Sequence, residues 1–376
     1  MENNDKRRVF FAAIDPYVEA NIVSPKETKY TGREWVEWGD RNIYPEYLLE
    51  LSKTVPSLRS VITGTVDFIC GDDVTIAVEM GGRRQGVMNK TGCTIAEQVR
   101  DLAGDFETYG GFALQVIRSF TGAVVEIYHI DMRYLRTNRD NTVFWYSEKW
   151  KEGRRNVLEY PAFYPHTPES WASLTDEERD RQASSIVYVK NVHTQTYPLP
   201  VYAAAVKACE TERCIDDYHL NAINNGFVAS AIINFNNGVP SDQIKEEIER
   251  DVNAKFAGHS NAQRILISWN DSKDVATTVQ QLKSDDFGAR YDALSKHTRQ
   301  QIFTAFRANP NLFGIPTDSL GFSEEEYQSA FRLYNRTAVR PVQRIIADAY
   351  DRILGVAGSI TIKPFSLDTA GESNVN

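Results

Sequence analysis

Residues 302–354 read IFTAFRANPNLFGIPTDSLGFSEEEYQSAFRLYNRTAVRPVQRIIADAYDRIL, and the order of signals in this stretch decides the fold. The Asn-Pro pair at 309–310 is expected to end a helix, because the residue before a proline avoids the helical region. Residues 311–322 are rich in turn formers and are predicted to form a loop. The stretch therefore begins with the end of one helix and continues into a Gly/Pro loop.

The loop is followed by a second helix signal. Ser323 and Glu326 have the spacing of a capping box, in which each residue satisfies a backbone N–H near the helix start. A long helix is predicted over 323–354. Pro341 should kink it near its middle, because proline removes one helical hydrogen bond and crowds the preceding turn.

Two further long helices are predicted upstream of this stretch. The first spans about 201–224 and is entered through a Pro-Leu-Pro sequence, and the second spans about 286–308. Between them, apolar strand-like segments at 227–235 and 264–269 flank a charged helix that Ser241 should cap. The second half of the chain is therefore expected to place a small strand–helix–strand insert between two long helices.

The first half of the chain combines helices with several strands. Helical spacing of apolar residues occurs on both sides of Pro56, which should restart a helix, and again over 94–109. Thr121-Gly122 is a hairpin signal. The polar segment 166–182 is expected to be a surface excursion. Strands are predicted at 73–80, 112–120, 123–130, 141–150, 184–191 and 359–365. Those at 141–150 and 184–191 are expected to belong to the same sheet as the hairpin. The pattern indicates an α+β fold.

Composition excludes several classes of protein. The 376-residue chain has a net charge of −9, which argues against a protein that coats nucleic acid with a basic face. There is no apolar run long enough for a membrane span, and the N-terminus lacks the core of a signal peptide. The four cysteines show no CxxC spacing, so free thiols in a reducing cytoplasm are expected; they are Cys70, Cys93, Cys209 and Cys214.

No catalytic constellation emerges from the sequence. The six histidines are too far apart for an HExxH-type zinc site, and phosphate-binding glycine motifs and GxSxG are absent. The acidic pairs at 72–73 and 216–217 are better interpreted as a polar turn and a solvated helix face than as metal ligands. Cys209 and Cys214 are expected to be small buried residues. We therefore predict no catalytic residue, no metal and no cofactor.

Three stretches of the sequence resemble the portal proteins of tailed phages, in particular the shorter siphophage type. In residues 198–235 a helix with a small-residue start leads to an Asn-Gly exit and a strand. Residues 302–354 are similar to the family's helix end, Gly/Pro loop and kinked helix. Residues 109–136 are similar to its upstream hairpin. The ordered series extends over roughly 37–365, although no single motif in it is highly specific.

The resemblance implies a portal fold with a mixed α/β wing, a two-helix stem, a small α/β clip and a kinked long C-terminal helix. This division assigns residues 1–200 and 309–365 to the wing, 201–225 and 285–308 to the stem, and 226–284 to the clip. A tunnel loop near DNA would comprise Ile315, Pro316, Thr317, Asp318, Ser319, Leu320, Gly321 and Phe322. Residues 366–376 are expected to be a disordered tail, so a crown should be minimal or absent.

The resemblance also implies partners and a location. The protein would form a homo-oligomeric ring, a dodecamer, around double-stranded DNA at the portal vertex of a virion assembled in the cytoplasm of a bacterial host. It would contact the major capsid protein, the large terminase subunit and the head–tail adaptor. A channel must hold DNA without gripping it, which the acidic balance fits. Cations that could still reach the lumen are Arg290, Lys296 and Arg299.

Two alternatives stay open at this point. One is another ring-forming head–tail connector, or the portal of a domesticated prophage or gene-transfer particle. The other is a metal-dependent nucleic-acid-processing enzyme, for which the acidic pairs at 72–73 and 216–217 would be the candidate ligands.

Overall fold

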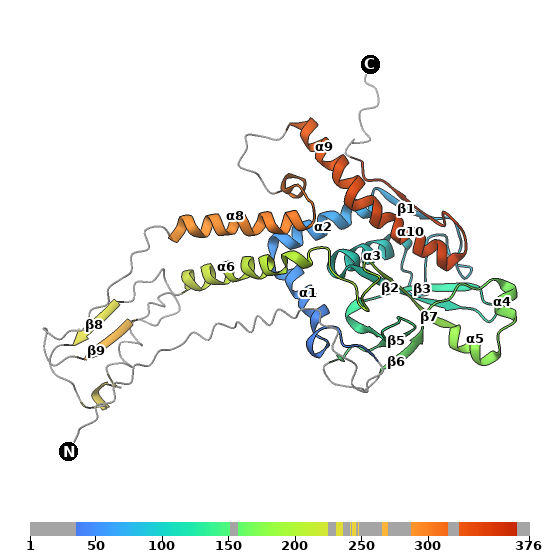
Figure 1. Cartoon of the computed structure of the whole chain (residues 1–376), viewed down its shortest axis with the longest axis horizontal. Helices are drawn as coiled ribbons and strands as arrows, with labels where there is room; N and C mark the ends of the chain where they lie inside the picture. Colours follow the sequence, from blue (N-terminus) through green and yellow to red (C-terminus); the bar gives the residue numbers. More distant parts are fainter. Residues whose placement is uncertain are drawn as a thin grey trace. The chain divides into compact units, whose positions relative to one another are not determined.

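The computed structural model describes residues 35–150, 157–224, 231–235, 265–269, 287–314 and 323–366, with a few positions between 241 and 247. The chain divides into two compact units. Unit 1 comprises residues 1–207 and 303–376, and unit 2 comprises 208–302. Unit 1 is thus built from both ends of the chain, and unit 2 is an insertion between them (Figure 1).

The main sheet of unit 1 has three antiparallel strands with β2 (Gly111–Arg118) in the centre. β3 (Val124–Ile130) and β7 (Ser184–Lys190) pair with its two edges. The turn between β2 and β3 contains Gly122, so the predicted hairpin is confirmed. Most residues of β2 are buried, including the consecutive Phe112, Ala113 and Leu114, so the central strand is covered on both faces.

A second three-stranded sheet was not predicted. It contains β4 (Leu135–Thr137), β5 (Val143–Tyr146) and β6 (Leu158–Pro161), in that order. The expectation that 141–150 joins the sheet of the hairpin is wrong. The side chain of Asn138 accepts hydrogen bonds from the backbone N–H groups of Thr142 (2.8 Å) and Val143 (3.2 Å), and this turn folds β5 back onto β4.

The helices of unit 1 form a layer on the main sheet. α3 (Ile95–Tyr109) contacts β2 and β3, and α1 (Tyr44–Thr54) and α2 (Pro56–Cys70) pack on α3. Pro56 occupies the first turn of α2 as predicted. Side chains that are fully buried among these helices include Leu48, Leu51, Leu58, Val99 and Leu102. Gln98 of α3 donates to the carbonyl of Ile127 (2.6 Å) and accepts from Tyr350 (2.7 Å), so the helical layer is also hydrogen-bonded to β3.

A two-stranded antiparallel sheet joins the two parts of unit 1. β1 (Asp73–Ile76) pairs with β10 (Ile360–Lys363), almost 300 residues later in the chain. Gly71 precedes β1 with a φ of 63°, and a Cβ atom there would overlap the carbonyl oxygen of Lys363. Both facts require glycine at this position.

The surface excursion at 166–182 is helical. It forms two short helices, α4 (Pro168–Ala172) and α5 (Asp176–Gln182), each capped by a threonine side chain. Most of its residues are exposed, as expected, but Trp171 is buried against the β2–β3 turn and donates its indole N–H to the carbonyl of Phe120 (3.0 Å). The tryptophan therefore attaches the excursion to the hairpin.

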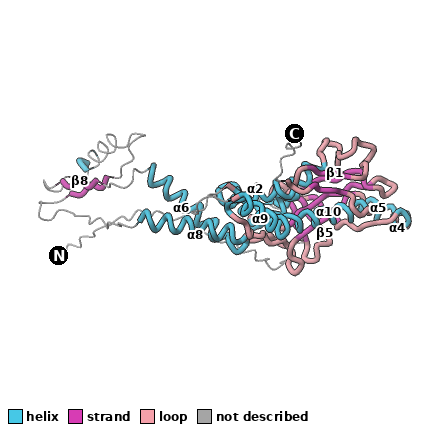
Figure 2. The backbone as a smooth tube through the Cα atoms, turned by 90° about the horizontal axis from the view of Figure 1, so that it is seen from above, coloured by secondary structure: helices cyan, strands magenta, loops and turns pink. Residues whose placement is uncertain are grey.

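The long helix predicted over 323–354 is present in three consecutive pieces. α9 (Glu324–Tyr334) and α10 (Arg340–Leu354) flank a π-helical turn, η7 (Asn335–Val339). The capping box of Ser323 and Glu326 is confirmed. Pro341 lies in the first turn of α10, and the wider π turn directly before it accommodates the missing N–H. α10 contacts β10 and β7. Figure 2 shows α9 and α10 as helices beside the strands of unit 1.

Unit 2 contains the two long helices and the strands of the insert. α6 (Val206–Asn224) begins in unit 1 after a 3-10 turn, η4 (Ala203–Ala205), and α8 (Phe287–Ala305) ends in unit 1. β8 (Ala231–Phe235) and β9 (Ile265–Trp269) pair in parallel. Parallel pairing needs a crossover connection, which agrees with a strand–helix–strand insert.

The remaining short elements are 3-10 turns in unit 1: η1 (Asp40–Asn42), η2 (Met132–Tyr134) and η6 (Pro310–Phe313). No helix in the described ranges is both long and apolar enough to cross a membrane.

Candidate functional site

The predicted tunnel loop, 315–322, lies outside the described residues, but both of its attachment points are described. On one side, η6 ends at Gly314 with a φ of 75°. On the other side, the Ser323 hydroxyl accepts the N–H of Glu326 (3.3 Å), and the Glu326 carboxylate accepts the N–H of Ser323 (3.1 Å). The loop therefore starts at a glycine cap and ends at a capping box, both within unit 1.

An aromatic cluster holds the first attachment point. The ring of Phe313 packs edge-on against Tyr334 (5.5 Å between centroids) and Phe68 (6.0 Å). Ser60 of α2 donates its hydroxyl to the Phe313 carbonyl (3.1 Å). A Cβ atom at Gly64 would lie 2.7 Å from the Phe313 ring, so this helix position is shaped to admit it. We conclude that the base of the loop is fixed to α2 and α9.

The end of α8 is a Schellman-type cap. The N–H of Ala308 bonds to the carbonyl of Phe303 (2.9 Å), and the N–H of Arg307 bonds to that of Thr304 (3.0 Å). Arg307 has a φ of 55°, a conformation that glycine adopts at lower cost. The Asn-Pro signal thus predicted the helix end within a few residues. It did not predict that an arginine would occupy the left-handed position.

The predicted lumen cations lie on α8 in unit 2. Lys296 and Arg299 are exposed, whereas the side chain of Arg290 lies outside the described residues. Thr298 and Ile302 on the same helix are buried. The exposed side of α8 thus carries the charges, as a helix with one packed face requires.

The helices α6 and α8 contact each other through aromatic rings. Tyr218 and Tyr291 stack with centroids 5.1 Å apart and planes 8° apart. Burial, and then the neighbouring Tyr218, raises the pKa of Tyr291. Cys209 is buried as predicted, but Cys214 is exposed, because residues five apart on a helix point in different directions.

The acidic residues considered as metal ligands are dispersed. Asp73 begins β1, and Asp72 lies 3.7 Å from the ammonium group of Lys363. Asp216 and Asp217 are exposed on α6. Within the part of the chain that the structure describes, no three His, Cys, Asp or Glu residues are grouped so that they could hold a metal ion.

Unit 1 contains buried titratable groups that the sequence did not indicate. His129 and Asp105 are 2.8 Å apart. Burial is the largest single influence and lowers the pKa of His129, but Asp105, Asp101 and Asp131 together raise this pKa by more, so the net shift is upward. Burial raises the pKa of Asp105 to about 6 and that of Glu107 on the same helix to about 8. The only sequence signal for their burial is the spacing of Asp105 and Glu107 relative to the apolar residues of α3.

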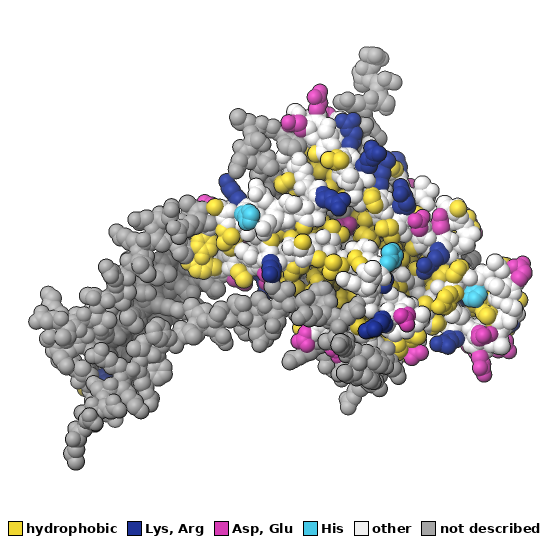
Figure 3. All heavy atoms as spheres, viewed as in Figure 1, with side chains coloured by type: hydrophobic (Ala, Val, Ile, Leu, Met, Phe, Trp, Pro, Cys, Tyr) yellow, Lys and Arg dark blue, Asp and Glu magenta, His cyan; other side chains and the backbone are white. Residues whose placement is uncertain are grey.

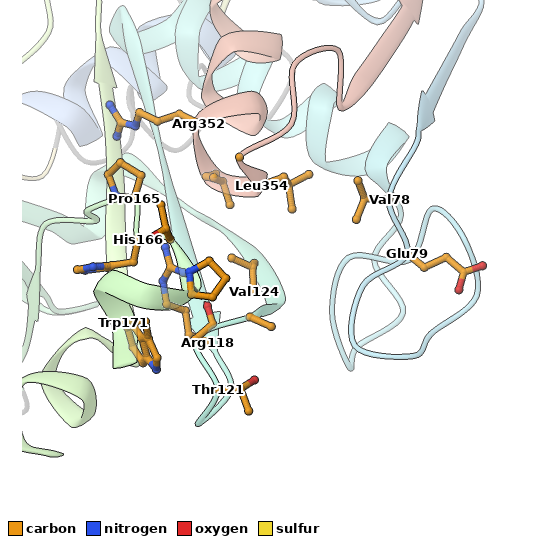
Figure 4. Close-up of a pocket in the computed structure, with 16 residues that line it drawn as sticks. Val78, Glu79, Arg118, Thr121, Val124, Pro165, His166, Trp171, Arg352 and Leu354 are labelled. Atoms are coloured by element: carbon orange, nitrogen blue, oxygen red, sulfur yellow. Dashed lines mark hydrogen bonds between the residues drawn. The ribbon is translucent and has the colours of Figure 1, made fainter. Parts of the chain in front are cut away.

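A cavity of about 530 Å³ lies beside the β2–β3 hairpin and the end of α10 (Figure 4). Arg118 is 8% exposed there and donates to the carbonyls of Gly122 (2.7 Å) and Tyr164 (3.2 Å). Its guanidinium lies over the Trp171 ring (5.5 Å), while Glu79 points away from it on another loop. The cavity thus presents a held cation against aromatic rings.

Comparison with known proteins gives the family. A family model described as phage portal protein matches residues 92–368. No curated protein sequence matches the chain.

Solved structures are similar to the chain at low sequence identity, and those with a TM-score above 0.5 share its fold. A chain from the neck of an empty gene transfer agent particle, computed with C6 symmetry, is 18% identical, with a TM-score of 0.55 over 87% of this chain and 85% of that one. A chain from the neck of the native particle, computed with C12 symmetry, is 17% identical, with a TM-score of 0.52 over 87% and 86%. An HK97 family phage portal protein from Corynebacterium diphtheriae is 11% identical, with a TM-score of 0.49 over 84% and 93%. Since the family model spans well over half of the sequence, the chain belongs to the phage portal protein family.

Proposed function

We propose that the protein is the portal subunit of a phage-type particle and assembles into a ring through which double-stranded DNA enters and leaves. The observation that carries this proposal is the match to the portal family over residues 92–368. The likeness of fold to particle-neck chains, which extends over 87% of this chain, supports it. Portal proteins are structural proteins, and we propose that this one acts without a catalytic residue or cofactor.

The two compact units support a division of roles. Unit 1 would be the wing, and unit 2 would contain the stem helices and the clip. The unit boundaries fall at 207/208 and 302/303, within α6 and α8, close to the stem ends expected at 201 and 308. Two long helices, one leading from unit 1 into unit 2 and the other leading back, are what a stem requires.

The loop 315–322 would approach the DNA in the channel. Its support is the rigid attachment described above: Phe313 in the aromatic cluster on one side and the capping box of Ser323 on the other. Arg290, Lys296 and Arg299 would face the lumen of the stem, and the exposure of Lys296 and Arg299 is compatible with that role. A ring repeats each exposed cation once per subunit, so weak individual contacts add.

The partners follow from the same proposal. The ring would be a dodecamer, which the twelve-fold symmetry of the neck of a native gene transfer agent particle supports. It would lie in the particle at the portal vertex, contacting the major capsid protein, the large terminase subunit and the head–tail adaptor. Assembly would take place in the cytoplasm of the bacterial host.

A gene-transfer particle is a second candidate setting. The likeness to neck chains of gene transfer agent particles favours it, although at 17–18% identity that likeness is one of fold. Sequencing the DNA inside purified particles separates the two settings. Random host fragments would indicate gene transfer, and the particle's own genes would indicate a phage.

Size-exclusion chromatography with negative-stain electron microscopy tests the function directly. We expect the purified chain to form rings with a central hole wide enough for a DNA duplex. A protein that stays monomeric across salt and protein concentrations would contradict the proposal.

A further inference from the structure

Four arginines follow one another at intervals of four residues along α9, η7 and α10. They are all exposed, and we call them the arginine stripe: Arg332, Arg336, Arg340 and Arg344. Buried side chains of the same helices, such as Tyr334, Val339 and Ile346, face the core of unit 1. Figure 3 shows dark blue side chains gathered over the region of α9 and α10.

The π turn keeps the arginine stripe on one face of the helix. In an α-helix of 3.6 residues per turn, each step of four residues advances the side chain by about 40° beyond a full turn. Three such steps would carry the last arginine by about 120° around an uninterrupted α-helix. Residues 335–339 are π-helical, with i→i+5 bonding and more residues per turn, so four residues there fall short of a full turn. The excess rotation of the α-helical steps and the shortfall of the π-helical step therefore partly cancel, which keeps the four arginines on one face.

The arginine stripe has no acidic partner within the described residues. Arg332 contacts its own helix through the Gln328 carbonyl (3.3 Å) and the Ser329 hydroxyl (3.4 Å). No carboxylate in the described part of the chain lies within ion-pair distance of any of the four guanidinium groups, and this includes Asp348, one step beyond Arg344. Like charges at i,i+4 spacing repel and destabilise a helix. Four uncompensated cations on a chain of net charge −9 therefore point to an external polyanion.

We propose that the arginine stripe binds the phosphate backbone of double-stranded DNA, an inference that rests on the proposed portal function. Steps of four helical residues place the Cα atoms of successive arginines about 6 Å apart along the helix axis, so the four extend over about 18 Å. A duplex strand presents a phosphate every 3.4 Å or so along its axis, so a linear series of cations meets a linear series of anions. The forked guanidinium donates two parallel hydrogen bonds to phosphate. Such contacts are independent of base sequence, as a DNA conduit requires.

The test compares two variants with equal loss of charge. The stripe variant is R332Q/R336Q/R340Q/R344Q. The control replaces four exposed basic residues elsewhere on unit 1, in the variant K53Q/R59Q/R139Q/R181Q. Because all eight positions are on the surface, both variants should unfold at nearly the wild-type temperature. Binding of a fluorescent duplex of about 30 base pairs to the assembled protein is measured by anisotropy over a series of salt concentrations.

We expect the stripe variant to bind the duplex about tenfold or more weakly at low salt. Its slope of log affinity against log salt should become shallower by about 3.6, since each of the four lost phosphate contacts removes about 0.9. The control should keep a slope near that of the wild type. Equal slopes for the stripe variant and the wild type would overturn the inference.

The same samples separate this inference from the proposed function. If the wild type forms rings and the stripe variant keeps the wild-type slope, the inference fails and the function stands. If the stripe variant loses its rings and keeps the wild-type slope, the stripe binds a neighbouring subunit and the inference also fails. If the wild type forms no ring and the slope still depends on the stripe, DNA binding stands and the portal function fails.

Discussion

Unit 1 and the helix pair of unit 2 differ in where their large apolar side chains lie. In unit 1, Leu48, Leu51 and Leu58 are completely buried within the chain itself. On α6 and α8 of unit 2, Leu220 is 57% exposed and Leu294 is 42% exposed. Exposed apolar patches mark contact surfaces in soluble proteins. Unit 1 thus has a buried core, although Phe120 and Leu333 are exposed on its surface. For the helix pair of unit 2, we expect other copies of the chain to cover the two exposed leucines.

The largest expected effect tests the core of unit 1. The buried ring of Phe68 packs against four aromatic rings, those of Phe313, Phe331, Tyr334 and Phe365. Phe68→Ala should lower the free energy of unfolding by about 3–5 kcal/mol, because it leaves a cavity in this cluster. Urea denaturation measures the loss. Phe120→Ala is the control: this ring is 79% exposed, and its removal should change stability by less than about 0.5 kcal/mol.

The matching change in unit 2 should affect assembly more than stability. Replacing both Leu220 and Leu294 by Ser should cost the isolated subunit about 1 kcal/mol or less, since both side chains are exposed. Ring formation, followed by light scattering after size exclusion, should be lost or need a much higher protein concentration. Val356→Ser, an exposed position of unit 1, is the control. Intact rings from the double variant would show that this surface is not a subunit contact.

A pH series tests how completely unit 1 excludes water. Burial raises the pKa of Glu107 from 4.5 to about 8. Between these values the folded state holds a proton that the unfolded state has released, so wild-type stability should fall as pH rises, and level off above about 8. In Glu107→Gln the part of this dependence that Glu107 contributes should disappear, while the parts that Asp105 and His129 contribute remain. The stability difference between the two proteins should grow by more than about 1 kcal/mol from pH 5 to 8. A constant difference would mean that water reaches Glu107.

The smallest expected effect concerns the end of α8. Arg307→Gly should raise the free energy of unfolding by up to about 1 kcal/mol, because glycine adopts the left-handed conformation without a Cβ penalty. The added flexibility of the unfolded chain offsets part of the gain. Thermal unfolding measures the net gain in stability. Arg307→Ala, which keeps a Cβ atom, should show no such gain.

Local signals predicted much of the fold. Pro56, the Thr121-Gly122 turn and the capping box of Ser323 and Glu326 each act within a few residues, and the structure confirms all three. Failures occurred where side-chain hydrogen bonds or distant residues decide. The separate sheet of β4, β5 and β6 depends on side-chain bonds of Asn138, and β1 pairs with a strand almost 300 residues away. Neither arrangement leaves a periodic signal in the sequence.

The candidate site was predicted less completely than the fold. The loop 315–322 was identified by its turn formers and the family resemblance, and it stays a prediction. The aromatic cluster that holds its base was not foreseen, because Phe68 and Phe313 meet only in three dimensions. The arginine stripe was visible as a four-residue repeat. Pro341 predicted a kink in this helix. The π turn that precedes it cannot be derived from the spacing of residues in the sequence.

The pairing of β1 with β10 has a consequence for biosynthesis. Residues 73–76 are translated early, but their partner strand at 360–363 emerges only when the ribosome has nearly finished the chain. The edge of β1 stays without its partner until then, and long-range strand pairing is slow to form. Unit 2, encoded between the two strands, is complete before unit 1 can close. A truncated polypeptide therefore contains the helices that would join a ring without the closed wing, and such nascent fragments should be targets for chaperones and proteases.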